Sequence, residues 1–285
     1  MHSICIITDN TAQFVTPSFP GKSITRIIPF SIELNGKPVP QENEASLHEL
    51  PSIATARLQP KLIAPTPETF RQLFAELGNQ YNEVIGIFSS SKLTDCFKNA
   101  KAATHAQLGS PKILLIDSLS TSFGLGYLVQ TAAEAAVKGT NCIDIERKLR
   151  NIIQRTYAVF CIPGLTYLHY SGFLDQAQAI VGDMLGIYSI FAIEEGFLTP
   201  VEKVKSKRNI LLNFQEFLDE FEKLESLALI QGTSFCPQEI RALREYIRSH
   251  FPTSIYSEHQ MNLPLALLFG PQSTGLFAIE KESHF

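Results

Sequence analysis

Short apolar runs alternate with a helical period through the first half of the chain. Residues 3–8, 84–88 and 113–116 are almost continuously apolar, which is typical of strands that are buried on both faces. From Pro67 to Gly78, apolar residues recur at the i, i+3, i+4 and i+7 spacing of an amphipathic helix, with Thr66 as its predicted N-cap. This alternation predicts a mainly parallel sheet with helices packed on its faces.

Two further signals in this half concern extended structure. Residues 24–32 predict one extended segment. The sequence Leu-Asn-Gly-Lys at 34–37 predicts a hairpin turn, because Asn-Gly tolerates the left-handed backbone that such turns require.

The second half of the chain has a different rhythm, in which glycines separate short segments. A long helix is predicted from Ser206, and two apolar runs lie on either side of Gly270-Pro271 near the end. We therefore predict an α/β protein whose N-terminal domain, over 1–160, carries a mainly parallel sheet. A smaller α+β domain is predicted over 161–285.

Composition narrows the function classes. The chain has 285 residues, 45% of them apolar and 18% charged, a balance that fills a core and excludes a disordered protein. A net charge of −4 without any dense Lys/Arg run argues against nucleic acid as a partner. No apolar stretch approaches the ~18 residues of a membrane span, and the first residues do not resemble a signal peptide. We expect a soluble cytoplasmic protein without membrane insertion.

Cysteine and histidine usage predicts no metal and no cofactor. The cysteines are odd in number, widely scattered and without a C-x-x-C pair, which argues against a zinc site or a disulfide framework. We expect reduced, buried thiols. The histidines show no H-E-x-x-H or similar spacing. The cysteines are Cys5, Cys96, Cys142, Cys161 and Cys236.

Two short motifs match enzyme signatures only in part. Ser89 to Lys92 satisfies the S-x-x-K of penicillin-binding proteins and class A β-lactamases, but the K-T-G element is absent. Gly124 and Gly126 begin a G-x-G-x-x-G pattern whose third glycine is replaced by Val129. Close packing of a helix on the sheet explains these glycines better than a nucleotide site.

Polar residues follow the predicted strands. Asp9, Ser89-Ser90-Ser91 and Asp117-Ser118 come directly after three apolar runs, and ligands of parallel sheets bind at such strand ends. One interpretation is a polar turn in which a serine or Thr94 caps the following helix. The other is an anion site, since hydroxyls beside helix-start N–H groups bind carboxylate or phosphate. The local sequence leaves both open.

Several segments, in the same order along nearly the whole chain, resemble conserved motifs of the DegV family. Each segment alone is weak, and their shared order is specific. The segments are Ile7–Ala12 (I-T-D-S-T-A), Ile28-Pro29-Phe30 with Asn35-Gly36, Pro65–Phe70 (the end of T-S-Q-P-S-P-x-x-F), Ser90–Leu93 (S-S-x-L), Ile116–Ser118 with Gly124 and Gly126, Leu165–Leu168 with Ser171-Gly172 (L-x-Y-L-x-x-G-G-R-I), and Gly196, Pro200 and Lys203–Lys205.

The resemblance implies a DegV-like two-domain fold, with a Rossmann-like first domain, that binds a long-chain fatty acid or related lipid. The carboxylate is expected at the domain interface and the tail is expected to be buried. It also implies that a separate ATP-using fatty-acid kinase subunit receives the bound acid, and that this protein is itself no enzyme. The ligand-binding positions carried over from the family motifs are Ser90, Ser91, Leu62, Ala64, Gly270 and Pro271.

Several family polar residues are replaced in this chain. The threonine and glutamine of T-S-Q-P fall on Leu62 and Ala64, so only the serine side of the carboxylate site is retained. The arginine of G-G-R-I falls on Phe173, and the histidine of H-x-G-P-G falls on Leu268. Two alternatives therefore stay open: a divergent DegV-fold protein that binds another apolar ligand, and a serine-dependent hydrolase acting through the triple serine.

Overall fold

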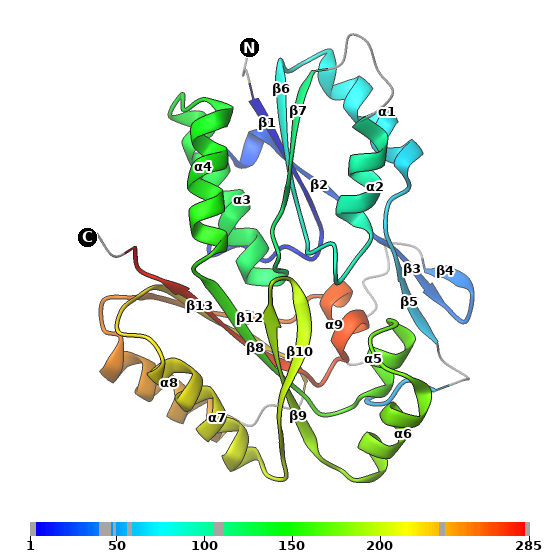
Figure 1. The fold of residues 1–285 in the computed structure, drawn as a ribbon, viewed down its shortest axis with the longest axis vertical. Helices are drawn as coiled ribbons and strands as arrows, with labels where there is room; N and C mark the ends of the chain where they lie inside the picture. Colours follow the sequence, from blue (N-terminus) through cyan, green and yellow to red (C-terminus); the bar gives the residue numbers. More distant parts are fainter. Residues whose placement is uncertain are drawn as a thin grey trace. The chain divides into compact units, whose positions relative to one another are not determined.

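The computed structural model describes residues 4–39, 47, 50–55, 59–104, 111–233 and 237–282, and Cys236 therefore lies outside the described residues. The chain forms two compact units (Figure 1). Unit 1 comprises Met1–Ser31, Ile63–Gln154 and Glu195–Phe197, and unit 2 comprises Ile32–Leu62, Arg155–Glu194 and Leu198–Phe285.

These units differ from the predicted division of the chain into two domains at 160/161. Unit 2 contains the early segment 32–62. The chain passes from unit 1 to unit 2 between residues 154 and 155, before the strand Thr156–Ile162, whereas the predicted boundary at 160/161 falls inside that strand. Unit 2 is consequently the longer of the two along the sequence, whereas the predicted C-terminal domain was the smaller. The assignment of functional domains remains a prediction.

Unit 1 is built on a four-stranded parallel sheet. Its strands lie in the order β2-β1-β6-β7, and every pairing is parallel, which confirms the predicted Rossmann-like α/β class. Figure 1 shows α1 and α2 to one side of this sheet and α3 and α4 to the other. The elements are β1 (Ile4–Asp9), the 3-10 turn η1 (Lys22–Ile24), β2 (Thr25–Ile28), α1 (Pro67–Gly78), β6 (Glu83–Phe88), α2 (Cys96–Ala103), β7 (Lys112–Asp117), α3 (Ser122–Val137) and α4 (Cys142–Ile153).

Local signals define several of these elements. α1 has the predicted bounds, and its N-cap Thr66 accepts a hydrogen bond from the Thr69 N–H at 3.2 Å. Gly126 in α3 allows a close approach to the segment after β1, because a Cβ there would lie 2.1 Å from the carbonyl oxygen of Gln13.

The predicted extended segment 24–32 is wrong in one respect. It is split into β2 and β3 (Ser31–Leu34), which belong to different sheets. Pro29 lies at the break, where it has no N–H to donate to a ladder, and the Phe30 N–H donates to Oδ1 of Asn10 at 3.0 Å.

A small three-stranded sheet follows, in the order β4-β3-β5, with β4 at Lys37–Val39 and β5 at Pro60–Ile63. The predicted hairpin between β3 and β4 is confirmed. Asn35 and Gly36 adopt φ angles of 54° and 72°, the left-handed backbone that the turn requires.

Unit 2 contains a six-stranded, mainly antiparallel sheet in the order β10-β9-β8-β13-β11-β12. Only the β11–β12 pairing is parallel among those described. The predicted helix from Ser206 is confirmed as α7, which Ser206 caps. The elements are β8 (Thr156–Ile162), α5 (Thr166–Tyr170), α6 (Gln176–Met184), β9 (Tyr188–Glu194), β10 (Phe197–Val204), α7 (Lys207–Asp219), β11 (Leu224–Gln231), α8 (Pro237–His250), β12 (Ile255–Gln260), α9 (Leu263–Phe269) and β13 (Thr274–Glu280).

The two faces of this sheet have different surroundings. Val159, Cys161 and Ile190 form a buried cluster with the apolar stripes of α7 and α8. Phe160, the alternate residue of β8, instead contacts Phe269 of α9, with ring centroids 4.9 Å apart. The period-2 alternation of β8 therefore separates a filled core from a second apolar layer.

Candidate functional site

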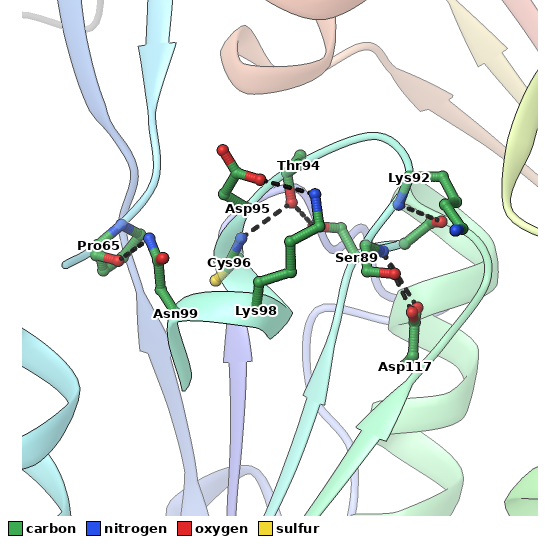
Figure 2. A network of polar contacts seen from close by, with 11 residues as sticks. Pro65, Ser89, Lys92, Thr94, Asp95, Cys96, Lys98, Asn99 and Asp117 are labelled. Atoms are coloured by element: carbon green, nitrogen blue, oxygen red, sulfur yellow. Dashed lines mark hydrogen bonds and ion pairs between the residues drawn. The ribbon is translucent and has the colours of Figure 1, made fainter. Parts of the chain in front are cut away.

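A polar cluster lies at the carboxyl ends of β1, β6 and β7 in unit 1, where the sequence predicted a site (Figure 2). Its central segment, residues Ser89–Thr94, is called the serine turn below. Asp9 and Asp117 flank it from the ends of the neighbouring strands β1 and β7.

Asp9 has a structural role. Its side chain is fully buried, Oδ1 accepts hydrogen bonds from the N–H and hydroxyl of Thr11, and Oδ2 accepts one from the Ser89 N–H at 2.7 Å. Burial raises the pKa of this carboxyl group, while the hydrogen bonds oppose the rise. Asp9 thus ties the ends of β1 and β6 together.

Asp117 holds the backbone of the serine turn. Its two carboxylate oxygens lie 3.2 and 3.3 Å from the Ser91 nitrogen, and Oδ1 also accepts the Leu119 N–H at 3.1 Å. Figure 2 shows Asp117 directed toward the turn. The Ser91 N–H is therefore already paired and is not available to a bound anion.

Ser90 is a structural hydroxyl. It is fully buried, donates to the carbonyl oxygen of Gly196 at 2.8 Å and accepts the Lys92 N–H at 3.1 Å. A Cβ on Gly196 would lie 2.4 Å from this hydroxyl oxygen. The close approach of the β9–β10 turn to Ser90 therefore favours glycine at position 196. Ser90 has its hydrogen-bonding capacity committed to the fold.

Ser91 presents its hydroxyl differently. The residue is half-buried, and its hydroxyl forms no hydrogen bond with any residue that the structure describes. Ser89, by contrast, shares a 2.8 Å hydrogen bond with the hydroxyl of Thr94. Of the three serines, Ser91 is the one whose hydroxyl is free to donate to a ligand.

The helix after the serine turn favours the capping interpretation. α2 begins at Cys96, and Oγ1 of Thr94 accepts the Cys96 N–H at 3.4 Å (Figure 2). Neither Ser90 nor Ser91 caps this helix. Among the described residues, no histidine or lysine side chain forms a hydrogen bond with the hydroxyls of Ser89 or Ser90.

Unit 2 holds an apolar cavity of about 680 Å³, within the range of small-molecule sites, ~300–1,000 Å³. Its wall is formed by the segment through α5 and α6 and by β9 and β10. The lining residues are Leu165, Phe173, Leu174, Gln178, Val181, Gly182, Leu185, Ile187, Ser189, Phe191, Leu198, Pro200, Val201, Glu202 and Lys203.

Two contacts position α6 beside this cavity. Oδ1 of Asp183 accepts the Leu165 N–H at 2.7 Å, which fixes the helix to the segment before α5. A Cβ on Gly182 would lie 2.4 Å from Cδ1 of Leu165, so the helix packs closely against this side chain. Val181 and Leu185 are 54% and 65% exposed, which shows that the cavity wall on α6 is also partly solvent-accessible.

The other predicted site residues lie in ordinary structural positions. Leu62, in β5, is the last residue of the early segment of unit 2, Ala64 lies in unit 1, and both are half-buried. Gly270 ends α9 with φ 94°, and the carbonyl oxygen of Pro271 accepts the Thr233 N–H at 2.8 Å. None of these four lines the described cavity, and their roles in binding stay predictions.

Two residues that replace polar residues of the family pattern lie in apolar surroundings. Phe173, at the family arginine position, lines the cavity. Leu268, at the family histidine position, is buried in α9. The cavity-lining set itself was not predicted from the sequence. Three sequence features could have indicated the cavity. They are the helix that begins at 176 and contains Gly182, the following Gly186, and a lone serine in β9.

The described thiols are buried and unpaired, as expected. These are Cys5, Cys96, Cys142 and Cys161. Within the described residues, no group of three His, Cys, Asp or Glu side chains is arranged to hold a metal ion. The same residues include no helix that is long and apolar enough to span a membrane.

The two compact units and their sheets define a two-unit α/β protein. A family model described as "Uncharacterised protein, DegV family" matches residues 3–281. The chain therefore belongs to the DegV family, which confirms the resemblance drawn from its motifs.

Relatives and solved structures match over nearly the full length. A DegV domain-containing protein of Caldanaerobacter subterraneus subsp. tengcongensis is 24% identical over 286 residues, covering 99% of this chain and 100% of the relative. A fatty-acid-binding DegV family protein from Streptococcus agalactiae has a TM-score of 0.82 at 18% identity, covering 99% and 100% of the two chains. The Streptococcus pneumoniae Fatty Acid Kinase (Fak) B3 protein, solved with linoleic acid, has a TM-score of 0.79 at 15% identity, covering 98% and 100%. These structures show the fold.

Proposed function

We propose that this protein binds a long-chain fatty acid and that the acyl chain occupies the apolar cavity of unit 2. The observation that carries the proposal is the cavity itself, about 680 Å³ in volume and lined mainly by apolar side chains. Burial of an acyl chain contributes about 0.8 kcal/mol per CH₂, so a cavity of this kind favours long chains. The fatty-acid complexes of other DegV proteins support the same ligand class.

For the carboxylate, we propose Ser91 as the hydrogen-bond donor. Its hydroxyl has no partner among the described residues, whereas that of Ser90 is held by Gly196. The ammonium group of Lys92, the next residue, is exposed and lies 4.7 Å from the ring centroid of Phe197. A positive charge on the residue next to Ser91 lowers the cost of holding a carboxylate nearby. Leu62 and Ala64 offer no side-chain donor, so Ser91 has to act without the family's threonine.

The protein is proposed to be a cytoplasmic carrier without catalysis of its own. The Fak B3 relationship supports a further step, in which a separate ATP-using kinase subunit phosphorylates the presented acid. The described thiols, buried and reduced, are compatible with a cytoplasmic setting.

The test is a calorimetric titration of the lipid-free protein with oleate and with methyl oleate. We expect saturable binding of the acid near one molecule per chain and weaker binding of the ester, which lacks the charge. Absence of binding for both would contradict the proposed function. For hand-over, the loaded protein is incubated with a fatty-acid kinase subunit and ATP, and acyl phosphate is measured.

A further inference from the structure

One polar group in the cavity wall is unexplained by the binding of a plain acyl chain. Ser189 of β9 is only 3% exposed, lines the cavity, and has a hydroxyl with no hydrogen-bond partner among the described residues. The other polar side chains in the wall, Gln178, Glu202 and Lys203, belong to exposed residues that water can solvate. Ser189 is thus a buried hydroxyl without a described partner in the wall of an apolar site.

The sheet geometry shows how apolar its surroundings are. β9 pairs antiparallel with β8, with Ser189 opposite Ile162 and Phe191 opposite Phe160. Directly opposed residues and residues two apart along a strand project from the same face. Ser189 therefore shares its face with aromatic and aliphatic side chains, and alanine would fill the same place without an unpaired polar group.

We propose that the ligand is a long-chain fatty acid that carries a hydroxyl or keto oxygen part-way along its chain, and that Ser189 hydrogen-bonds to this oxygen. A neutral oxygen needs only one such partner. A carboxylate at the same place would be under-satisfied, because the described residues of this face supply no further donor and the bound acyl chain displaces water. This inference rests on the proposed function and specifies its substrate class.

The test compares stearic acid with 10-hydroxystearic and 12-hydroxystearic acids by calorimetric titration of the lipid-free protein. In the unmodified protein, at least one hydroxy acid should bind about three- to tenfold more tightly than stearic acid. Ser189→Ala should remove this preference and should bind stearic acid about two- to fivefold more tightly, because it leaves no buried hydroxyl unpaired. Ser189→Thr keeps the hydroxyl and should keep the preference.

Ser226→Ala is the matched control. Ser226 is a fully buried serine of the same sheet, on β11, but its hydroxyl donates to the carbonyl oxygen of Ile255 at 3.2 Å and does not line the cavity. This variant should retain the hydroxy-acid preference.

The outcomes separate the two proposals. If stearic acid binds and neither hydroxy acid is preferred, or if Ser189→Ala keeps the preference, the inference is wrong and the proposed function stands. If none of the acids binds, the proposed function fails and the inference fails with it.

Discussion

Replacing Ser91 by alanine should weaken fatty-acid binding while leaving the stability of the ligand-free protein unchanged. The Ser91 hydroxyl makes no hydrogen bond within the described chain, so its removal leaves no protein group unpaired. A hydrogen bond to a charged group contributes about 1.5–3 kcal/mol, which corresponds to about a ten- to hundredfold loss of affinity for the acid.

The neighbouring serine provides the matched comparison. Ser90→Ala removes the donor to the buried Gly196 carbonyl, at 2.8 Å, and the acceptor for the Lys92 N–H, at 3.1 Å. An unsatisfied buried group costs about 1–3 kcal/mol, and each kcal/mol lowers the melting temperature of a domain by roughly 2–8 °C. Ser90→Ala should therefore lower the melting temperature of the ligand-free protein.

Scanning calorimetry of the two ligand-free variants and titration of both with oleate separate these effects. The reasoning would be refuted if Ser91→Ala destabilised the ligand-free protein while binding oleate normally, because Ser91 would then be structural. It would equally be refuted if Ser90→Ala left the melting temperature unchanged.

Three further predictions concern the head group, the cavity and the thiols. Leu62→Thr should tighten oleate binding by up to ~1.5–3 kcal/mol and raise the preference for oleate over methyl oleate; an unchanged acid-to-ester ratio in titration would place Leu62 away from the carboxylate. Leu198→Trp narrows the cavity and should weaken binding of stearate more than that of decanoate, whereas Leu212→Trp on the exposed surface of α7 should change neither; equal losses for the two acids would contradict the placement of the acyl chain. Burial raises the pKa of Cys5 to about 11 and that of Cys161 to about 12, so at pH 8 about one thiol in a thousand or fewer is ionised; peptide mass spectrometry should find both unmodified by iodoacetamide until the protein is denatured.

Local patterns predicted several elements of the first half of the chain well because each element carries its own signal. The apolar run that forms β1, the capped helix α1 and the Asn-Gly turn after β3 are all specified within about a dozen residues. The parallel sheet follows from their alternation, since parallel strands need helical crossovers.

The candidate site depends instead on contacts between distant segments. Ser90 and Gly196 are 106 positions apart, so nothing near the triple serine indicates which hydroxyl is already bound. The segment 32–62 belongs to unit 2, which no local periodicity specifies. The cavity likewise results from β9, β10 and α6 packing together, which the apolar helix, the two glycines and the lone Ser189 do not specify by themselves.

The most direct test of the account is to identify what the purified protein carries. Native mass spectrometry, followed by denaturing extraction and lipid analysis, should show roughly one long-chain fatty acid per chain, because burial of each CH₂ contributes about 0.8 kcal/mol and favours retention through purification. A protein that carries no lipid and takes up neither added oleate nor added palmitate would contradict the account.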